Sequence, residues 1–177
     1  KHKGNPEFEY LHNYKRIAMS EYKNKYDFIS RTQKILEQYD KSSIETKYEK
    51  TLFMNCCIGL LVVPQQWNDK NDPTIYNKIS LSGMVDESVW GINSSDIKKN
   101  IPKNGLGDLS IENIAYHFRN SLCHYHFEVL AKDTEKIDTL CIEDYYPDNI
   151  TKTFEMTISF DNFIKFVRKY AEEKMAL

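Results

Sequence analysis

The sequence predicts a mainly α fold, a helical bundle with a small antiparallel β-hairpin or three-stranded sheet inserted before the C-terminal helix. Three observations predict it. Apolar residues recur every three or four positions in several long stretches, which is the period of an amphipathic helix. One stretch, residues 52–63, is apolar nearly all round and therefore suits the centre of a core. After residue 126 the pattern changes to short runs rich in β-branched and aromatic side chains.

The bulk properties describe one domain covering residues 1–177, with a net charge of −2 and a pI of about 6.2. A protein with this charge lacks the overall basic surface of many nucleic-acid binders, so any contact with RNA must use local positive charge. The longest apolar run, residues 58–63, is far shorter than the ~20 residues of a membrane span, and we expect no membrane contact. The cysteines form no C-x-x-C pair, which favours reduced thiols and a cytoplasmic location.

The first half of the chain predicts two helices and a long connection. The first helix is expected over residues 14–39, and a turn follows at residues 40–43. The second helix is expected over residues 44–63, with Pro64 ending it. Its Gly59 is either a point of close helix packing or simply tolerated. Residues 64–109 are interrupted by prolines and glycines and predict an irregular insertion, with short helical turns near residues 75–84 and 96–101.

The second half predicts a helix over residues 110–126, capped by Asp108 or Ser110, then a small sheet and a last helix. The last helix begins at Ser159 or Asp161, with Phe163, Val167, Tyr170 and Ala171 facing inward. The strands of the small β element, which occupies residues 127–160, are expected at residues 127–131, 137–144 and 154–160, with turns at 133–136 and 147–149.

The helix at 110–126 carries two stripes of different chemistry. The apolar stripe consists of Ile111, Ile114, Phe118, Leu122 and Tyr125. The polar stripe alternates amides and imidazoles: Asn113, His117, Asn120 and His124. Solvated helix faces usually carry Glu and Lys, so this row indicates that the helix is the active element of the chain.

Three residues of this helix form a sufficient set for cleaving RNA without a metal. Arg119 offers a permanent charge and a fork of donors suited to phosphate oxygens. A histidine such as His124 serves as a general acid or base, and Asn120, one turn earlier on the same face, can hold the imidazole or a phosphate oxygen. The imidazole would assist attack of the ribose 2′-hydroxyl on its own phosphate, while the arginine stabilises the developing charge. We therefore expect 2′,3′-cyclic phosphate products.

The spacing adds a condition on assembly. Arg119 and His124 are five residues apart, or roughly 140° around a helix, so one copy cannot easily aim both groups at one atom. A symmetric homodimer would pool them in one cleft, with the polar row as the seam between copies. The alternative for the same row is a buried polar seam that only sets dimer register.

Other polar residues have weaker functional interpretations. Lys98, Lys99 and Lys103 precede the helix and are either phosphate contacts or a solvated loop. His117 and His126 are expected in structural or auxiliary roles, as RNA contacts at most, and the same holds for Asn113. A metal site built from His117, Cys123, His124 and His126 is the second functional class. Neighbouring helical residues point about 100° apart, which disfavours a shared ion, so no metal and no cofactor are expected.

The stretch Arg-Asn-Ser-Leu-Cys-His, residues 119–124, resembles the Arg-polar-x-x-x-His signature of the HEPN superfamily of helical ribonucleases. Residues 48–64 and the helix-hairpin-helix ending are similar to a plasmid-borne, defence-associated HEPN subgroup, and the resemblance covers most of residues 20–175. It implies a metal-independent endoribonuclease with a composite dimer site, with Arg119 and His124 catalytic and Asn120 as the polar second residue.

The resemblance also implies partners and an alternative. Proteins of this kind act in antiviral defence, in abortive infection or as toxins, often with a defence-system or antitoxin partner protein. Other HEPN domains are non-catalytic RNA- or partner-binding dimer modules. HEPN toxins paired with nucleotidyltransferase antitoxins resemble Arg-x-x-x-x-His-x-Tyr, whereas this chain has His126 at the tyrosine position. That departure counts against control through a modified tyrosine.

Overall fold

The computed structural model describes residues 25–45, 48–65, 81–103, 105–133 and 136–176. Its strands form one antiparallel sheet in the order β1-β4-β3-β2. The strands are β1 (Ile97–Asn100), β2 (Phe127–Asp133), β3 (Lys136–Tyr145) and β4 (Lys152–Ser159). The helices are α2 (Lys25–Asp40), α3 (Glu49–Cys57), η1 (Ile58–Val62), α6 (Glu87–Trp90), η2 (Ser94–Asp96), α7 (Ile111–His124) and α8 (Phe160–Ala176).

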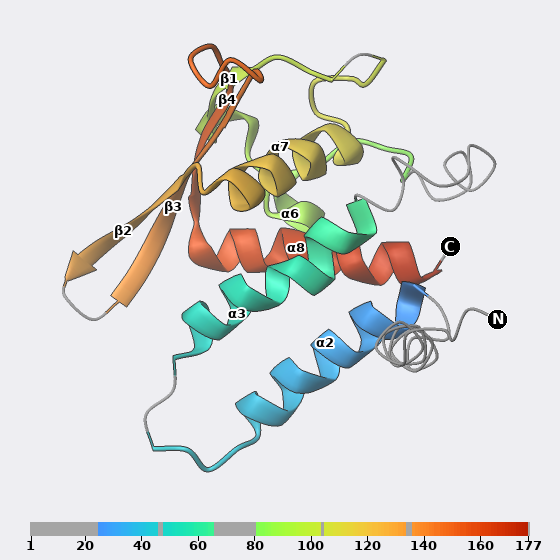
Figure 1. Cartoon of the computed structure of the whole chain (residues 1–177), viewed down its shortest axis with the longest axis vertical. Helices are drawn as coiled ribbons and strands as arrows, with labels where there is room; N and C mark the ends of the chain where they lie inside the picture. Colours follow the sequence, from blue (N-terminus) through green and yellow to red (C-terminus); the bar gives the residue numbers. More distant parts are fainter. Residues whose placement is uncertain (1–24, 46–47, 66–80, 104, 134–135, 177) are drawn as a thin grey trace, which may run out of the picture.

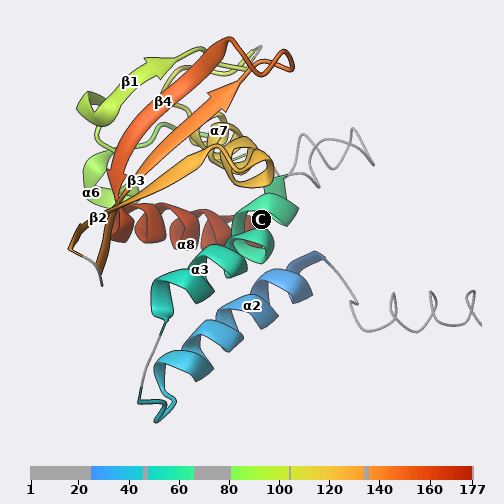
Figure 2. The same cartoon turned by 60° about the vertical axis from the view of Figure 1, so that its left-hand side comes forward.

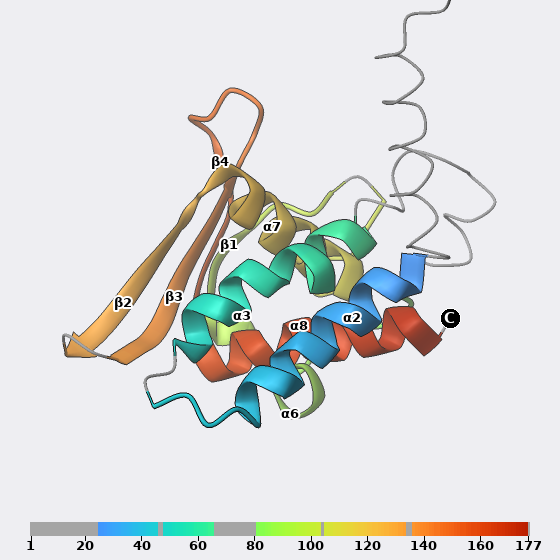
Figure 3. The ribbon, with the colours of Figure 1, turned by 60° about the horizontal axis from the view of Figure 1, so that its bottom comes forward.

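The elements are arranged in layers (Figure 1). Helices α7 and α8 lie against the sheet, α3 and η1 lie on the far side of these helices, and α2 is outermost (Figure 2). The far end of the β2–β3 hairpin projects beyond the helices (Figure 3). Within the described residues, every helix is too short or too polar to cross a lipid bilayer.

The architecture is α+β, and the expected helical bundle with a hairpin or three-stranded sheet is wrong. The three expected strands exist, as β2, β3 and β4, but a fourth strand pairs with β4 on its other side. This strand, β1, comes from the segment expected to be irregular, where residues 96–101 were expected to form a helical turn. Its sequence Ile-Lys-Lys-Asn is only four residues long and shows no alternation, as is common for short, charged edge strands.

The central parts of the helices lie where the sequence pattern predicted them, and their first and last residues differ from the prediction. Helix α7 begins after Ser110, whose side chain accepts a hydrogen bond from the Asn113 N–H, and α8 begins after Ser159, which does the same for Asn162. The four expected inward residues of α8 are buried. The beginning of the first expected helix, residues 14–24, and residues 75–80 lie outside the described residues.

The second helix does not end before Pro64. It widens into the π-helix η1, where the Val63 N–H bonds the Ile58 carbonyl five residues back, and it continues through Pro64 to Gln65. Proline has no N–H to donate, so a local departure from the α pattern just before it accommodates the ring. The consequence for the site is that Gln65, at the end of this helix, is buried beside α7.

Gly59 is a point of close helix packing. A Cβ placed on it would meet Thr32 Oγ1 at 2.3 Å and Phe28 Cε1 at 2.9 Å, both on α2. The Thr32 hydroxyl donates to the Phe28 carbonyl at 2.8 Å, so it has little freedom to move away. The absence of a side chain at Gly59 therefore sets how closely α2 approaches η1.

The core centres on Phe118 of α7. Its ring contacts Phe154 of β4 and Phe163 and Phe166 of α8, with centroid distances of 6.1, 5.6 and 5.1 Å. A buried carboxylate, Glu112, then ties α7 to α8. It accepts hydrogen bonds from Lys174 Nζ at 2.6 Å and the Tyr170 hydroxyl at 3.0 Å.

Replacing Gly59 with alanine should destabilise the fold. The added methyl group overpacks the α2–η1 contact, which typically costs about 1–3 kcal/mol. Gly107→Ala is the matched control, because a Cβ there meets no atom within 4 Å. Urea unfolding measures both variants. Equal midpoints for the two would show that α2 does not pack against η1 as described.

Candidate functional site

Helix α7 ends where its last residues can face solvent. Tyr125 caps the helix in the left-handed region, with φ of 59°, and its N–H bonds the Ser121 carbonyl. The His126 N–H bonds the same carbonyl at 2.8 Å, and the Ser121 hydroxyl donates back to the His126 carbonyl at 2.7 Å. These hydrogen bonds end the helix at His124, and the chain then continues into β2. Tyr125, expected in the apolar stripe, is instead 80% exposed.

The polar row does not form a continuous surface, which corrects the expectation of a seam along the whole helix. Asn113, His117 and Asn120 are buried by their own chain, with exposed fractions of 0%, 1% and 8%. His124 alone among the four is exposed. A partner copy can therefore meet this row only at its C-terminal end.

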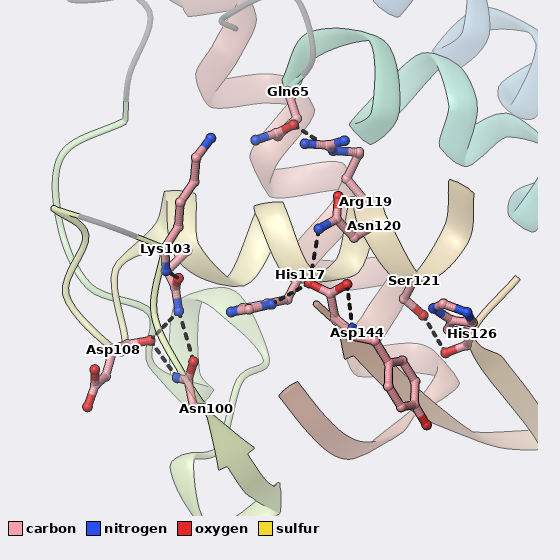
Figure 4. Close-up of polar contacts among 12 residues, drawn as sticks. Gln65, Asn100, Lys103, Asp108, His117, Arg119, Asn120, Ser121, His126 and Asp144 are labelled. Carbon is pink, nitrogen blue, oxygen red and sulfur yellow. Dashed lines mark hydrogen bonds and ion pairs between the residues drawn. The ribbon is translucent and has the colours of Figure 1, made fainter. Parts of the chain in front are cut away.

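The buried part of the row is organised by Asp144, at the end of β3 (Figure 4). One carboxylate oxygen, Oδ2, accepts from His117 Nδ1 at 2.8 Å and from Asn120 Nδ2 at 3.0 Å. The other, Oδ1, accepts from the Tyr145 N–H at 2.9 Å. Because an ionised carboxylate only accepts, this network assigns the proton of the His117 ring to Nδ1. The ring also stacks on Phe154 at 4.6 Å.

Asn113 performs a different task, at the other end of α7. Its amide oxygen accepts from the Lys103 N–H at 2.9 Å, and its amide nitrogen donates to Asn100 Oδ1 and to the Asp108 carbonyl. It holds the connection between β1 and α7 in place. Asn113 is therefore positioned as a loop anchor, well inside the protein.

Arg119 lies on the side of α7 that faces the end of the second helix. Its Nε donates to Gln65 Oε1 at 2.9 Å, and its guanidinium carbon lies 5.1 Å from the centre of the Tyr116 ring. Gln65 is itself buried. The guanidinium is thus oriented by a fixed amide and an aromatic face while its side chain stays partly exposed.

His124 stands beside His126, with ring centroids 5.8 Å apart. His126 in turn lies 4.9 Å from the Tyr145 ring. Next to them is an open cavity of about 420 Å³, lined by Tyr125, His126, Phe127, Glu128, Cys141, Glu143, Tyr145 and Asn149. His126 lines this cavity, and the exposed imidazole of His124 stands beside His126.

Glu143, beside this cavity, accepts hydrogen bonds from Tyr145 and Lys152. Burial alone would raise the pKa of Glu143, but hydrogen bonds from Lys152 and Tyr145 outweigh it and hold that pKa below its usual range. The bond to Glu143 raises the pKa of Tyr145. Glu143 is thus an anionic acceptor whose charge Lys152, at 2.5 Å, compensates.

The three lysines do not act as one cluster. Lys98 pairs with Glu155 at 3.2 Å, across β1 and β4. Lys99 is exposed on β1. Lys103 places its Nζ 4.6 Å from the Tyr116 ring, the same ring that Arg119 approaches. Only Lys103 is thereby brought near Arg119.

Cys123 and the histidines are not gathered round a common point. No three His, Cys, Asp or Glu side chains in the described parts of the chain lie close enough together to hold a metal ion. All four cysteines are free. Burial raises the pKa of the Cys123 thiol, although the Arg119 charge opposes the rise, so the reactive thiolate is disfavoured.

The family model described as HEPN pEK499 p136 matches residues 19–175. This chain is a HEPN protein. The match includes the whole second helix, α7 and the C-terminal β and α elements, so the Arg119–His124 motif lies inside it. Neither a curated protein nor a solved structure gives a match.

Two residues of this HEPN site were not among those predicted from sequence. Asp144 follows Leu140 and Ile142 at a spacing of two, so the strand pattern already placed a carboxylate on the buried face. Gln65 left no comparable signal. Its role arises because the second helix continues through η1 and ends beside α7. There Gln65 contacts Arg119, which is 54 positions later in the sequence.

Asp144→Asn should destabilise the protein, because the amide presents a nitrogen to at least one of the three donors that the carboxylate accepts. Leaving a buried donor unsatisfied costs about 1–3 kcal/mol. Asp138→Asn, on the same strand and half-buried, is the matched control. Urea unfolding measures the loss, and the ¹⁵N shifts of the His117 ring report the tautomer. An unchanged tautomer and midpoint would argue that Asp144 does not organise the row.

Proposed function

We propose that this HEPN protein is a metal-independent endoribonuclease that cleaves single-stranded RNA or RNA loops at a homodimer site. The observation that carries the proposal is the placement of the Arg119–His124 motif. Arg119 is oriented by the buried Gln65, and His124 is exposed on the last turn of α7. A fixed cation and an exposed imidazole are the two groups that phosphodiester cleavage requires.

The reaction follows from these groups. One imidazole takes the proton of the ribose 2′-hydroxyl, and the oxygen attacks the adjacent phosphorus. The bond from phosphorus to the 5′-oxygen breaks, and a second imidazole gives that oxygen a proton. Arginine donors stabilise the charge on the phosphorane oxygens. The products are a 2′,3′-cyclic phosphate and a 5′-hydroxyl, and no water or metal is consumed.

Two copies are needed because Arg119 and His124 lie roughly 140° apart around α7. A second copy of the chain can reach the polar row only at the exposed C-terminal end of α7, where His124 lies. Within one copy, Asn120 touches Asp144 rather than solvent. We assign it to positioning the helix, with His126 as an auxiliary group beside His124.

The biological setting is part of the proposal. A ribonuclease of this family would act in prokaryotic antiviral defence, by abortive infection or as a toxin, under the control of a partner protein. The second candidate is a non-catalytic RNA- or partner-binding dimer. One observation favours it: His117 and Asn120 are both committed to Asp144, which leaves fewer groups for chemistry.

Arg119→Ala and His124→Ala should each reduce cleavage of a single-stranded RNA by about 100-fold or more, since each removes a group of the transition state. Arg168→Ala, an exposed arginine on α8, is the matched control and should retain activity. EDTA should leave the rate unchanged. Intact RNA with the wild-type protein, or 3′-hydroxyl ends, would favour the binding-module alternative or another mechanism.

Mixing the two inactive variants tests the composite site. A heterodimer of Arg119→Ala with His124→Ala keeps one arginine and one histidine, contributed by different copies. If the site joins two copies, the mixture should regain part of the wild-type cleavage after exchange of subunits, because one arginine and one of the two imidazoles again meet in one cleft. If both groups act within one copy, every copy remains defective and the mixture stays inactive. Sedimentation of each variant alone confirms that dimerisation is intact.

A further inference from the structure

A second cavity, of about 200 Å³, lies between α7, the segment after β1 and the β3–β4 end of the sheet. It is distinct from the cavity of about 420 Å³ that His126 lines, and the two share only Tyr145. Its lining combines flat apolar surfaces with a few polar groups: Ile101, Pro102, Lys103, Tyr116, His117, Asp144, Tyr145, Tyr146, Pro147 and Thr153. This composition is usual for small-ligand sites.

Two polar atoms of the lining residues are buried without a hydrogen-bond partner among the described residues. They are His117 Nε2 and Thr153 Oγ1. An unsatisfied buried polar group is costly, so native proteins rarely keep two in one place. A bound group that supplied hydrogen bonds to both would recover that cost.

The backbone is built to place Thr153 here. Asp144 pairs with Phe154 and Tyr145 with Lys152, so Thr153 is an extra residue in β4 at this point. Such a bulge redirects side chains, and bulges are frequent beside functional sites. Its effect is visible in burial, because Thr153 and Phe154 are consecutive and both buried. A regular strand would have put one of them on the opposite face.

The donor and acceptor pattern indicates what the cavity takes. Asp144 fixes the His117 proton on Nδ1, so in the neutral ring Nε2 accepts. The complementary ligand group is therefore an N–H donor, which nucleobases carry on their edges and phosphate oxygens do not. Tyr145, Tyr146 and Pro147 supply the apolar walls that a planar base requires.

Two cations lie near one aromatic ring that lines this cavity. Lys103 lines the cavity and lies over one ring, Tyr116, which the Arg119 guanidinium also contacts. The distances from the ring centre are 4.6 Å and 5.1 Å. A nucleotide with its base in the cavity could therefore direct its phosphate along Lys103 towards Arg119.

We propose that this cavity is a nucleobase subsite for RNA, in which His117 Nε2 and Thr153 Oγ1 read the base edge. It holds a nucleotide near the cleaved bond and gives the enzyme a base preference. The inference rests on the proposed ribonuclease function for its biological use. Binding of a nucleotide, however, can be tested without cleavage.

The test uses the full chain carrying His124→Ala, titrated separately with AMP, CMP, GMP and UMP. At least one mononucleotide should shift the ¹⁵N resonance of His117 Nε2. Adding Thr153→Val should weaken binding of that nucleotide by about tenfold, because one hydrogen bond worth about 1.4 kcal/mol is lost. Thr157→Val, half-buried on the same strand but outside the cavity, is the matched control and should bind normally. Thr153→Val should not lower the unfolding midpoint, because it removes an unpartnered hydroxyl.

Several outcomes would overturn the proposal. The first is an unshifted His117 Nε2 signal with all four mononucleotides. The second is equal binding by the Thr153→Val and Thr157→Val variants. The third is a shift produced equally by inorganic phosphate, which would place an anion rather than a base in the cavity. Nucleotide binding in a protein that cleaves no RNA would instead retain the subsite and reject the nuclease function.

Discussion

The carboxylate of Asp144 is the interaction on which the site depends. A carboxyl group on a residue that is only 2% exposed is tolerated only when its hydrogen bonds are satisfied. Here three donors satisfy it: one from its own strand and two from α7. The bonds to His117 and Asn120 tie the middle of α7 to the end of β3.

Two further features place the candidate functional groups of this helix. Gln65 reaches Arg119 because the second helix continues through η1 and Pro64, although its sequence suggested an earlier end. Tyr125, in the left-handed region, ends α7 and leaves His124 exposed. The arginine is therefore oriented by a neighbouring helix, and the histidine by the helix terminus. Neither arrangement can be seen in the spacing of the two residues alone.

Helix α7 contributes to two separate surfaces of interest. Towards its C-terminus it presents Arg119 and His124, the groups proposed to act on RNA in a dimer. Towards the β1 connection it presents His117 to the cavity with Thr153. Tyr116, contacted by both Lys103 and Arg119, lies between them. Base recognition and cleavage would thus use the same helix, with Lys103 and Arg119 near the ring between them.

Local patterns in the sequence predicted much of this protein. The periodicity placed the core of each long helix and three of the strands, because burial repeats at 3.6 and at two residues. The arginine–histidine spacing indicated the HEPN family, which the family match confirms. These features depend on neighbours within a few positions, so the sequence alone determines them.

The tertiary structure decided the rest. β1 became a strand only because β4 offered it a free edge, and four residues carry no period of their own. Three of the four residues in the polar row are buried within the chain, and Asp144 holds two of them, Asn120 and His117, from 24 and 27 residues away. Gln65 and the Thr153 bulge likewise act through partners distant in sequence. Hydrogen bonds between distant segments depend on the completed packing, and a local pattern does not contain it.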